Sequence, residues 1–236
     1  ELFSIIARHG FKAHSYADDT QIYMSTPANS APDAARRFAV CVADVNTWMN
    51  RNRLKLNTDK TQIIWVGSRQ QLAKLVSTDV TLGSTTVGSS TTVVDLGLHL
   101  DNHLTMTAHV AHLSRSCYFQ LRQLRSVRRS LSTDATISLI HAFVSSRLDY
   151  CNSLLYKIPV GLLVKLQRIQ NAAARLVTGV RRWEHITPVL RRLHWLPVRS
   201  RIVFKITAIV YKCLHGLVPR YLARHCVPLT EVHGRG

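Results

Sequence analysis

The first hundred residues alternate short apolar and polar runs, as expected for small strands joined by turns. Segments 11–16 (FKAHSY) and 20–25 (TQIYMS) flank two adjacent acids. Their alternation predicts a β-hairpin whose tight turn holds Ala17, Asp18 and Asp19.

The remainder of this region predicts one helix, one buried strand and further hairpins. Ser30 is expected to cap a helix that ends near Asn52. The apolar run 61–66 (TQIIWV) predicts a buried strand, and β-branched residues interrupted by glycines over 80–100 predict one or two hairpins. One face of the helix carries Phe38, Val42, Val45 and Met49.

After His103 the apolar positions take a helical period. Helices are expected from about residue 106 to 131, from the Ser132 cap towards Leu148, over 162–178 before Gly179, from Thr187, and over 199–215. The sequence therefore predicts an α+β fold, with a small hairpin-containing unit over 1–104 and a basic helical region over 105–236.

Charge differs sharply between these two regions. The chain has 31 Lys and Arg against 13 Asp and Glu, a net charge of +18, and residues 101–236 account for 21 of the basic and 5 of the acidic side chains. Such an excess favours a polyanionic partner, most commonly nucleic acid. A solubilising surface and an acidic protein partner are the alternatives.

Three other features bear on the compartment and the core. The five cysteines have no disulfide-like spacing, which favours a reducing compartment, and we expect an intracellular protein of the cytoplasm and nucleus. Lys205 and Lys212 interrupt the apolar run 202–214, which predicts a core helix and no membrane partner. Trp183 and Trp195 adjoin apolar sequence, which favours a core role over base stacking.

The acidic turn has a specific chemical interpretation. Adjacent carboxylates repel each other, and a divalent cation cancels that repulsion. Mg²⁺ prefers such hard oxygen ligands, and polymerases use two of these ions in nucleotidyl transfer. The alternative is a solvated turn, in which Asp is common.

The order of motifs around this turn resembles a known enzyme family. YADD within HSYADDTQIYMS is followed by LKLNTDKTQIIWVGS (54–68) and VVDLGLHLDNHLTMTAHV (93–110). Downstream lie LSRSCYFQLRQLR, FVSSRLDYCNSLLY, LQRIQNAAARLVTG and LHWLPVRSRIVFKI. Over essentially its whole length the chain is similar to reverse transcriptases (RNA-directed DNA polymerases) of non-LTR retrotransposons, in the jockey-type and related long interspersed elements.

The resemblance implies roles for individual residues of the polymerase palm. Asp18 and Asp19 would be the catalytic Mg²⁺ ligands, with Mn²⁺ as a possible substitute. Tyr16 and Ala17 would lie at the primer terminus. Lys60 would protonate the departing pyrophosphate, although a surface cation is the plain alternative. Gly97, within LGLHLD, would belong to the hairpin that grips the primer.

The resemblance also implies a helical thumb that contacts the template and primer. In the family this element lies beside the duplex of RNA template and DNA primer. Its arginines would then contact phosphates, whereas a solvated helix face is the alternative. The arginines in question are Arg115, Arg122, Arg125 and Arg129.

The sequence departs from the family upstream of YADD. The family's first metal-binding Asp and its deoxynucleotide-binding fingers precede that motif, and this chain begins about a dozen residues before it. We therefore expect a fragment that lacks part of its own polymerase domain and does not polymerise alone. A non-catalytic nucleic-acid-binding module and an inactive transposon remnant stay open.

Overall fold

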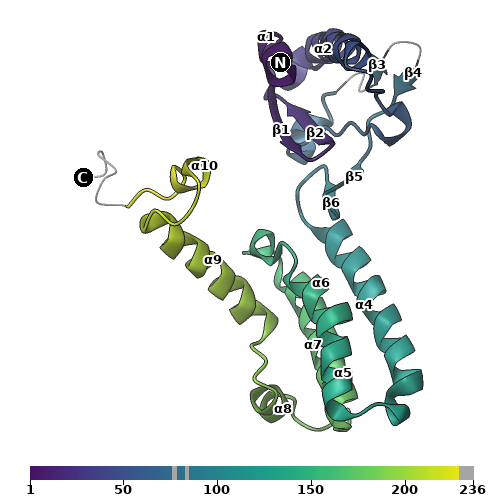
Figure 1. Cartoon of the computed structure of the whole chain (residues 1–236), viewed down its shortest axis with the longest axis vertical. Coiled ribbons are helices and arrows are strands. Elements are labelled where there is room, and N and C mark those ends of the chain that lie inside the picture. Colours follow the sequence, from purple (N-terminus) through teal and green to yellow (C-terminus); the bar gives the residue numbers. More distant parts are fainter. Residues whose placement is uncertain (76–78, 83–84, 229–236) are drawn as a thin grey trace. The chain divides into compact units, whose positions relative to one another are not determined.

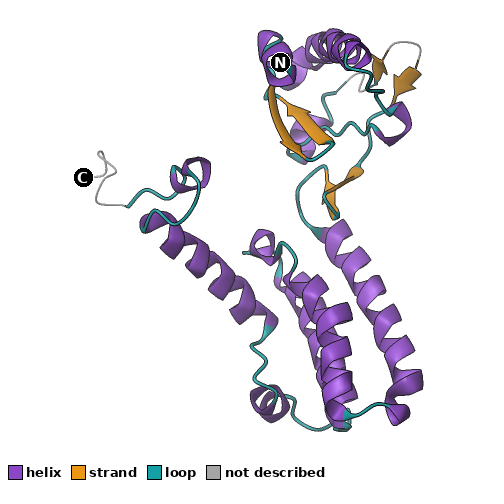
Figure 2. Cartoon of the chain, in the orientation of Figure 1, coloured by secondary structure: helices purple, strands orange, loops and turns teal. Residues whose placement is uncertain are grey.

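The computed structural model describes residues 1–75, 79–82 and 85–228. The chain has a mixed α+β structure and divides into two compact units, Glu1–Thr105 and Met106–Gly236 (Figure 1). All strands of the described residues lie in the first unit, and the second is helical (Figure 2). The expected α+β class is confirmed at this level.

The first unit contains three separate antiparallel hairpins among its described residues, and they do not join into one sheet. Its elements are α1 (Leu2–Arg8), β1 (Lys12–Tyr16), β2 (Asp19–Tyr23), η1 (Ala28–Ser30), α2 (Ala31–Arg51), η2 (Thr58–Lys60), α3 (Arg69–Leu72), β3 (Val80–Leu82), β4 (Thr85–Val87), β5 (Thr92–Asp95) and β6 (Leu98–Asp101).

Helix α2 organises the core of this unit. Its apolar stripe faces two clusters, as the spacing of the stripe predicts. One cluster joins Cys41 and Val45 of α2 to Ile6 of α1 and to Phe11, with Ala13 of β1 packed against it. The second joins α2 to β3 through Val42, Val80 and Leu82. The helix thereby supports β1–β2 on one cluster and β3–β4 on the other. Residues 83–84, between β3 and β4 in the sequence, lie outside the described residues.

One prediction for this unit is confirmed in position, and another is wrong. Ser30 occupies the N-cap position of α2, but its side chain makes no capping hydrogen bond. Residues 61–66 do not form a buried strand: Ile63 makes a single isolated bridge to Ser89, and Val66 is 52% exposed. A strand needs a partner along its length, and among the described residues this segment has only that single bridge.

The second unit is a bundle of helices. In Figure 1, α4, α5 and α7 run side by side, and each contacts the other two. The elements are α4 (Thr107–Val127), η3 (Arg128–Ser130), α5 (Thr133–Ile140), the π-helical η4 (His141–Ser145), α6 (Ser146–Asp149), η5 (Asn152–Leu155), α7 (Val160–Thr178), α8 (Thr187–Arg192), α9 (Val198–Leu214) and α10 (Arg220–Ala223).

Most of the helix boundaries in this unit agree with the predicted ones. The Ser132 side chain accepts a hydrogen bond from the Ala135 N–H at 3.2 Å and caps α5. Gly179 has φ 73° and ends α7 in the left-handed conformation. The predicted apolar stripe of α4 is buried at Val110, Leu113, Cys117, Leu121 and Leu124. Helix α4 ends at Val127, so the helix expected to reach about residue 131 stops earlier and is followed by the 3₁₀ turn η3.

Helix α9 corrects another prediction. Residues 202–214 were expected to form a core helix, but within this range only Ile202 and Cys213 are buried. Phe204 is 68% exposed and Tyr211 is 58% exposed. Lys205 and Lys212 share the helix with these apolar residues, so burying its whole circumference would also bury charges. No described helix is both long enough and apolar enough to cross a membrane.

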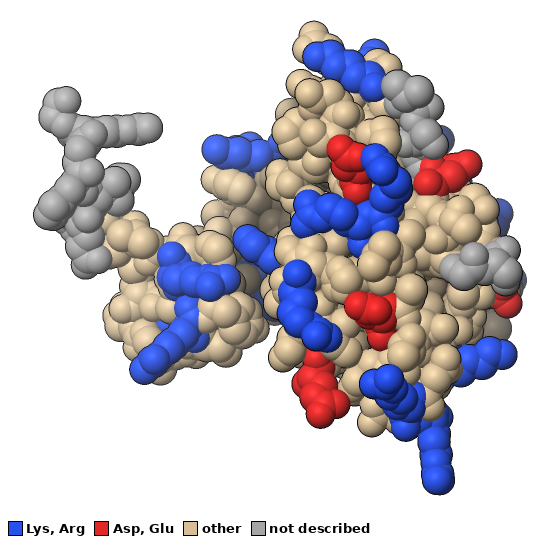
Figure 3. Space-filling view, turned by 90° about the horizontal axis from the view of Figure 1, so that it is seen from above, with Lys and Arg blue, Asp and Glu red and all other residues tan. Residues whose placement is uncertain are grey.

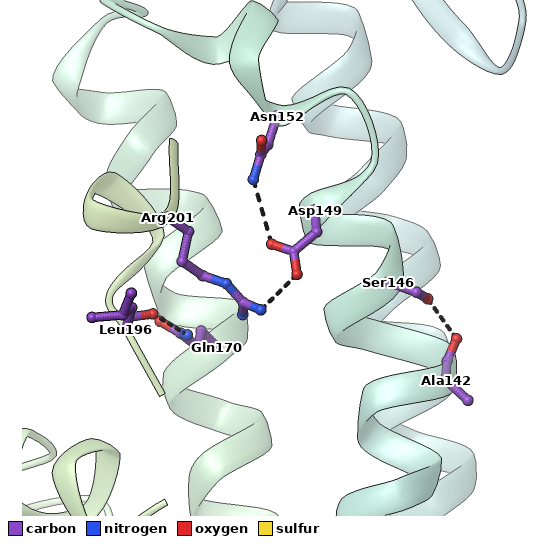
Figure 4. A network of polar contacts seen from close by, with 7 residues as sticks. All are labelled: Ala142, Ser146, Asp149, Asn152, Gln170, Leu196 and Arg201. Carbon is purple, nitrogen blue, oxygen red and sulfur yellow. Dashed lines mark hydrogen bonds and ion pairs between the residues drawn. The ribbon is translucent and has the colours of Figure 1, made fainter. Parts of the chain in front are cut away.

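Polar contacts fasten α9 to the bundle (Figure 4). The Arg201 guanidinium donates to the Asp149 carboxylate at 2.5 Å, and Asn152 donates to the same carboxylate at 3.4 Å. The Gln170 side chain donates to the Leu196 carbonyl at 2.8 Å. Burial raises the pKa of Asp149, although the Arg201 charge opposes that shift. The arginine therefore stabilises a carboxylate that its surroundings disfavour.

Candidate active site and nucleic-acid interface

The YADD motif lies at the tip of hairpin β1–β2. Tyr16 pairs with Asp19, so the two-residue connection consists of Ala17 and Asp18. The hairpin prediction is confirmed, but Asp19 is the first residue of β2 and not part of the turn. The Ser15 hydroxyl donates to the Asp19 carbonyl at 3.2 Å and lies 3.0 Å from the Thr20 hydroxyl. These contacts hold the two strands together directly beside the turn.

Ala17 adopts a conformation that is uncommon for a residue with a side chain. Its φ is 54°, in the left-handed region. Such a conformation costs of the order of 1 kcal/mol and persists only where the surroundings enforce it. The paired strands on either side supply that constraint.

The motif side chains are open to solvent. Tyr16 is 72% exposed, and Asp18 and Asp19 are both exposed. Because directly paired residues of an antiparallel hairpin point to the same face, the Asp19 side chain shares a face with Tyr16. The opposite face carries Ala13 and Ile22, which pack on the α1–α2 cluster. The hairpin thus buries one face and presents the motif on the other.

Two long-range hydrogen bonds link this hairpin to β5, and β5 in turn to the segment before it. The Gln21 side-chain amide of β2 donates to the Asp95 carboxylate of β5 at 2.6 Å. The Val94 N–H of β5 donates to the Gln62 side-chain carbonyl at 3.0 Å. The YADD hairpin, the LNTDKTQ segment and the LGLHLD hairpin are therefore neighbours within one unit.

The LGLHLD segment forms the turn and second strand of hairpin β5–β6. Asp95 pairs with Leu98, so Leu96 and Gly97 form the connection. Their φ angles are 44° and 81°, both positive, as a type I′ turn requires. Gly97 takes this conformation without strain, and Leu96 is the residue that carries the steric cost.

Lys60 lies apart from these bonds. It ends the 3₁₀ turn η2, where its N–H donates to the Asn57 side chain at 3.3 Å. The lysine is exposed, and among the described residues no hydrogen bond or ion pair joins its side chain to the YADD hairpin. Its position therefore fits an ordinary surface cation as well as a catalytic role.

The donor set of the turn fits a weakly held divalent cation. Within the described part of the chain, no hydrogen bond or ion pair engages the carboxylate of Asp18 or Asp19. Both side chains offer free hard oxygens, which suit Mg²⁺ or Mn²⁺. The described residues contain no group of three or more His, Cys, Asp and Glu side chains placed to hold a metal. Two carboxylates would leave a cation largely hydrated.

Comparison with known proteins identifies no relative. No family model matches the sequence, and neither a curated protein nor a solved structure matches the chain.

A row of exposed arginines follows helix α4. Arg115, Arg122 and Arg125 lie on α4 and Arg129 follows in η3; all four are exposed. A seven-residue spacing returns to nearly the same side of a helix, so Arg115 and Arg122 share a face. In the described residues, no ion pair joins any of the four to an acid. On the face that Figure 3 shows, Lys and Arg side chains lie among neutral residues, with several Asp and Glu side chains between them.

The two tryptophans of the helical unit have opposite environments. Trp195 is 8% exposed, so its predicted core role is confirmed. Trp183 is 76% exposed, and its predicted core role is wrong. The sequence contained a signal for this difference, because Trp183 lies directly between Arg182 and Glu184 in a turn.

Proposed function

We propose that the chain carries the YADD portion of an RNA-directed DNA polymerase of the non-LTR retrotransposon type. The observation that supports this best is the contact between motif segments. The YADD hairpin reaches Asp95 beside the LGLHLD turn through Gln21, and Gln62 of the intervening motif reaches the same strand. Segments more than seventy residues apart in the chain thus meet around one open hairpin face.

In this proposal, residues 1–104 are the C-terminal part of a palm and residues 105–236 are the thumb and a downstream helical region. Asp18 and Asp19 would hold Mg²⁺, which when bound supplies charge stabilisation for nucleotidyl transfer. Tyr16, exposed beside Asp19, would support the primer terminus. The Leu96–Gly97 turn would hold the primer backbone. Lys60 would donate a proton to the departing pyrophosphate.

The catalytic test is primer extension on a poly(rA) template with Mg²⁺ or Mn²⁺. The 236-residue chain should give no extension, because Asp18 and Asp19 alone hold a cation weakly. A longer chain, with a palm strand bearing the family's first metal-binding Asp and the fingers placed ahead of Glu1, should extend the primer. Asp18→Asn in that chain should abolish extension.

Two results would count against this proposal. Extension by the 236-residue chain that is lost in Asp18→Asn would refute the expected inactivity. An inactive longer chain that nevertheless binds template and primer would contradict the polymerase assignment itself.

A second candidate function is sequence-independent binding of nucleic acid without catalysis. The exposure of Arg115, Arg122 and Arg129 favours it, as does the absence of an ion pair to any of them within the described residues. Phosphate contacts release counterions, so affinity should fall steeply as salt rises. In filter-binding titrations, replacing all three by Gln should reduce the slope of log affinity against log salt by up to about 2.7, at about 0.9 per contact on duplex DNA.

A matched control separates phosphate contact from a general loss of charge. Arg36 is also exposed but pairs with Asp33 in the first unit. Arg36→Gln should leave the salt slope nearly unchanged. An equal slope for the wild-type chain and the triple variant would show that the α4 arginines are only a solvated face.

A further inference from the structure

Trp183 lies in the turn between α7 and α8, and its indole is open to solvent. It is 76% exposed, whereas Trp48, Trp65 and Trp195 are all partly or fully buried. A large aromatic ring left in water loses the burial that normally stabilises it.

The turn that carries Trp183 is held in place by hydrogen bonds. Arg175 of α7 donates to the carbonyls of Arg181 and Arg182 at 3.4 Å and to that of Glu184 at 3.3 Å. The Arg181 N–H donates to the Glu184 carboxylate at 2.8 Å, and the Glu184 N–H returns to the Arg181 carbonyl at 3.2 Å. These bonds order the backbone on both sides of Trp183. A ligand that binds here therefore pays little conformational entropy for ordering this turn.

A cation already lies against the indole. The Arg181 guanidinium carbon lies 5.3 Å from the centroid of the Trp183 ring, within the range of a cation–π contact. Arg182 is exposed beside it. The surrounding sequence is strongly basic, since residues 150–228 contain 14 Lys and Arg and a single acid, Glu184. The Glu184 carboxylate is occupied by the Arg181 N–H.

We propose that Trp183 and Arg181 form a stacking site for an unpaired base of a single-stranded nucleic acid, with Arg182 contacting a neighbouring phosphate. Aromatic rings beside cations bind single strands through the base faces and the backbone charge. A duplex keeps its base faces stacked internally, so this site selects single-stranded segments. The proposal deepens the nucleic-acid-binding part of the proposed function and rests on it.

The test compares two single-stranded DNA oligomers of equal length and charge, oligo(dA) and an abasic oligomer, on the whole 236-residue chain at low salt. Fluorescence anisotropy of the labelled oligomers measures affinity, and quenching of intrinsic tryptophan fluorescence reports stacking. The wild-type chain should bind oligo(dA) more tightly than the abasic oligomer, and oligo(dA) should quench the fluorescence. Trp183→Ala should weaken oligo(dA) binding by on the order of tenfold and leave abasic binding unchanged.

Two variants control for the aromatic ring and for general loss of exposed apolar surface. Trp183→Phe should retain most of the preference for oligo(dA), because a phenyl ring still stacks. Phe204, which is 68% exposed on α9, is the matched control, and Phe204→Ala should leave both affinities unchanged.

The outcomes distinguish this site from the proposed function. The wild-type chain could bind the two oligomers equally well and still lose binding in the triple variant of Arg115, Arg122 and Arg129. This result would overturn the stacking site and leave polyanion binding standing. Binding of neither oligomer would overturn the stacking site, while primer extension would still decide the polymerase assignment. Trp183-dependent binding of poly-glutamate as tight as that of oligo(dA) would replace the proposal with an acidic protein partner.

Discussion

Arg128 should be a structural residue, in contrast to the exposed arginines around it. Its Nε donates to the Leu176 carbonyl at 3.0 Å and its Nη2 donates to the Val177 carbonyl at 2.9 Å. Its Nη1 donates to the Leu131 carbonyl at 3.0 Å. Leu176 and Val177 are in the last turn of α7, where carbonyls lack helical partners. One guanidinium therefore connects the turn after α4 to the end of α7.

The expected cost of removing Arg128 follows from these three bonds. A hydrogen bond from a charged donor contributes about 1.5–3 kcal/mol. Arg128 is only partly buried, so water will replace some of these bonds after truncation. The arginine also places a positive charge at the negative end of the α7 dipole. We expect Arg128→Ala to lower the free energy of unfolding of the helical unit by about 2–3 kcal/mol, or Tm by roughly 10 °C.

Urea unfolding followed by far-ultraviolet circular dichroism measures this change. The slope of the free energy of unfolding against urea concentration should be the same in all variants compared. Arg129→Ala is the matched control, since Arg129 is the neighbouring residue but is exposed. It should change the free energy by less than about 0.5 kcal/mol. Equal midpoints for the two variants would refute the structural role of Arg128, as would a loss below about 0.5 kcal/mol in Arg128→Ala.

Two further predictions concern ionisable groups of the helical unit. Burial raises the pKa of the Cys117 thiol from 9.0 to about 11. Between these two pH values the thiol loses its proton in the unfolded chain but keeps it in the folded chain, so the free energy of unfolding falls as pH rises through this range. In denaturant titrations the stability gap between wild type and Cys117→Ala should shrink by up to about 2 kcal/mol over that range, and a constant gap would contradict the assignment. Arg201→Gln should cost about 1–2 kcal/mol at neutral pH, because it leaves the Asp149 carboxylate without its partner. Since burial raises the pKa of Asp149, protonation of this carboxylate in acid should relieve the cost of Arg201→Gln. At neutral pH the double variant Asp149→Asn/Arg201→Gln should therefore be more stable than Arg201→Gln alone. A cost that does not change with pH, or a double variant as unstable as Arg201→Gln, would argue against a buried charge.

Local signals in the sequence determined most of the elements. The stripe of α2, the Ser132 cap and Gly179 after α7 each depend on nearby residues, and each predicted element is present. The same is true of the YADD hairpin, since alternating strands on both sides of a tight turn define it locally. The candidate site residues could be named for the same reason, because they belong to contiguous motifs.

Tertiary contacts decided which elements are completed and which surfaces are open. The run 61–66 has the composition of a strand, but among the described residues it forms only one isolated β-bridge. The apolar run of α9 has only part of its surface covered, and Trp183 lies in a turn with polar neighbours instead of the core. In each case the outcome depends on a partner that lies elsewhere in the chain, which residue composition does not specify.

The distinction between Arg128 and Arg129 shows this limit at single-residue scale. Both belong to the basic stretch 122–129, in which Arg129 lies seven residues after Arg122 and Arg128 lies six. Only the packing of α7 beside η3 brings free helix-end carbonyls within reach of Arg128. Sequence determined that this stretch is cationic and near a helix end, because charge and helical period are local properties. Tertiary structure decided which cation is used internally, because a hydrogen bond requires its acceptor to be in place.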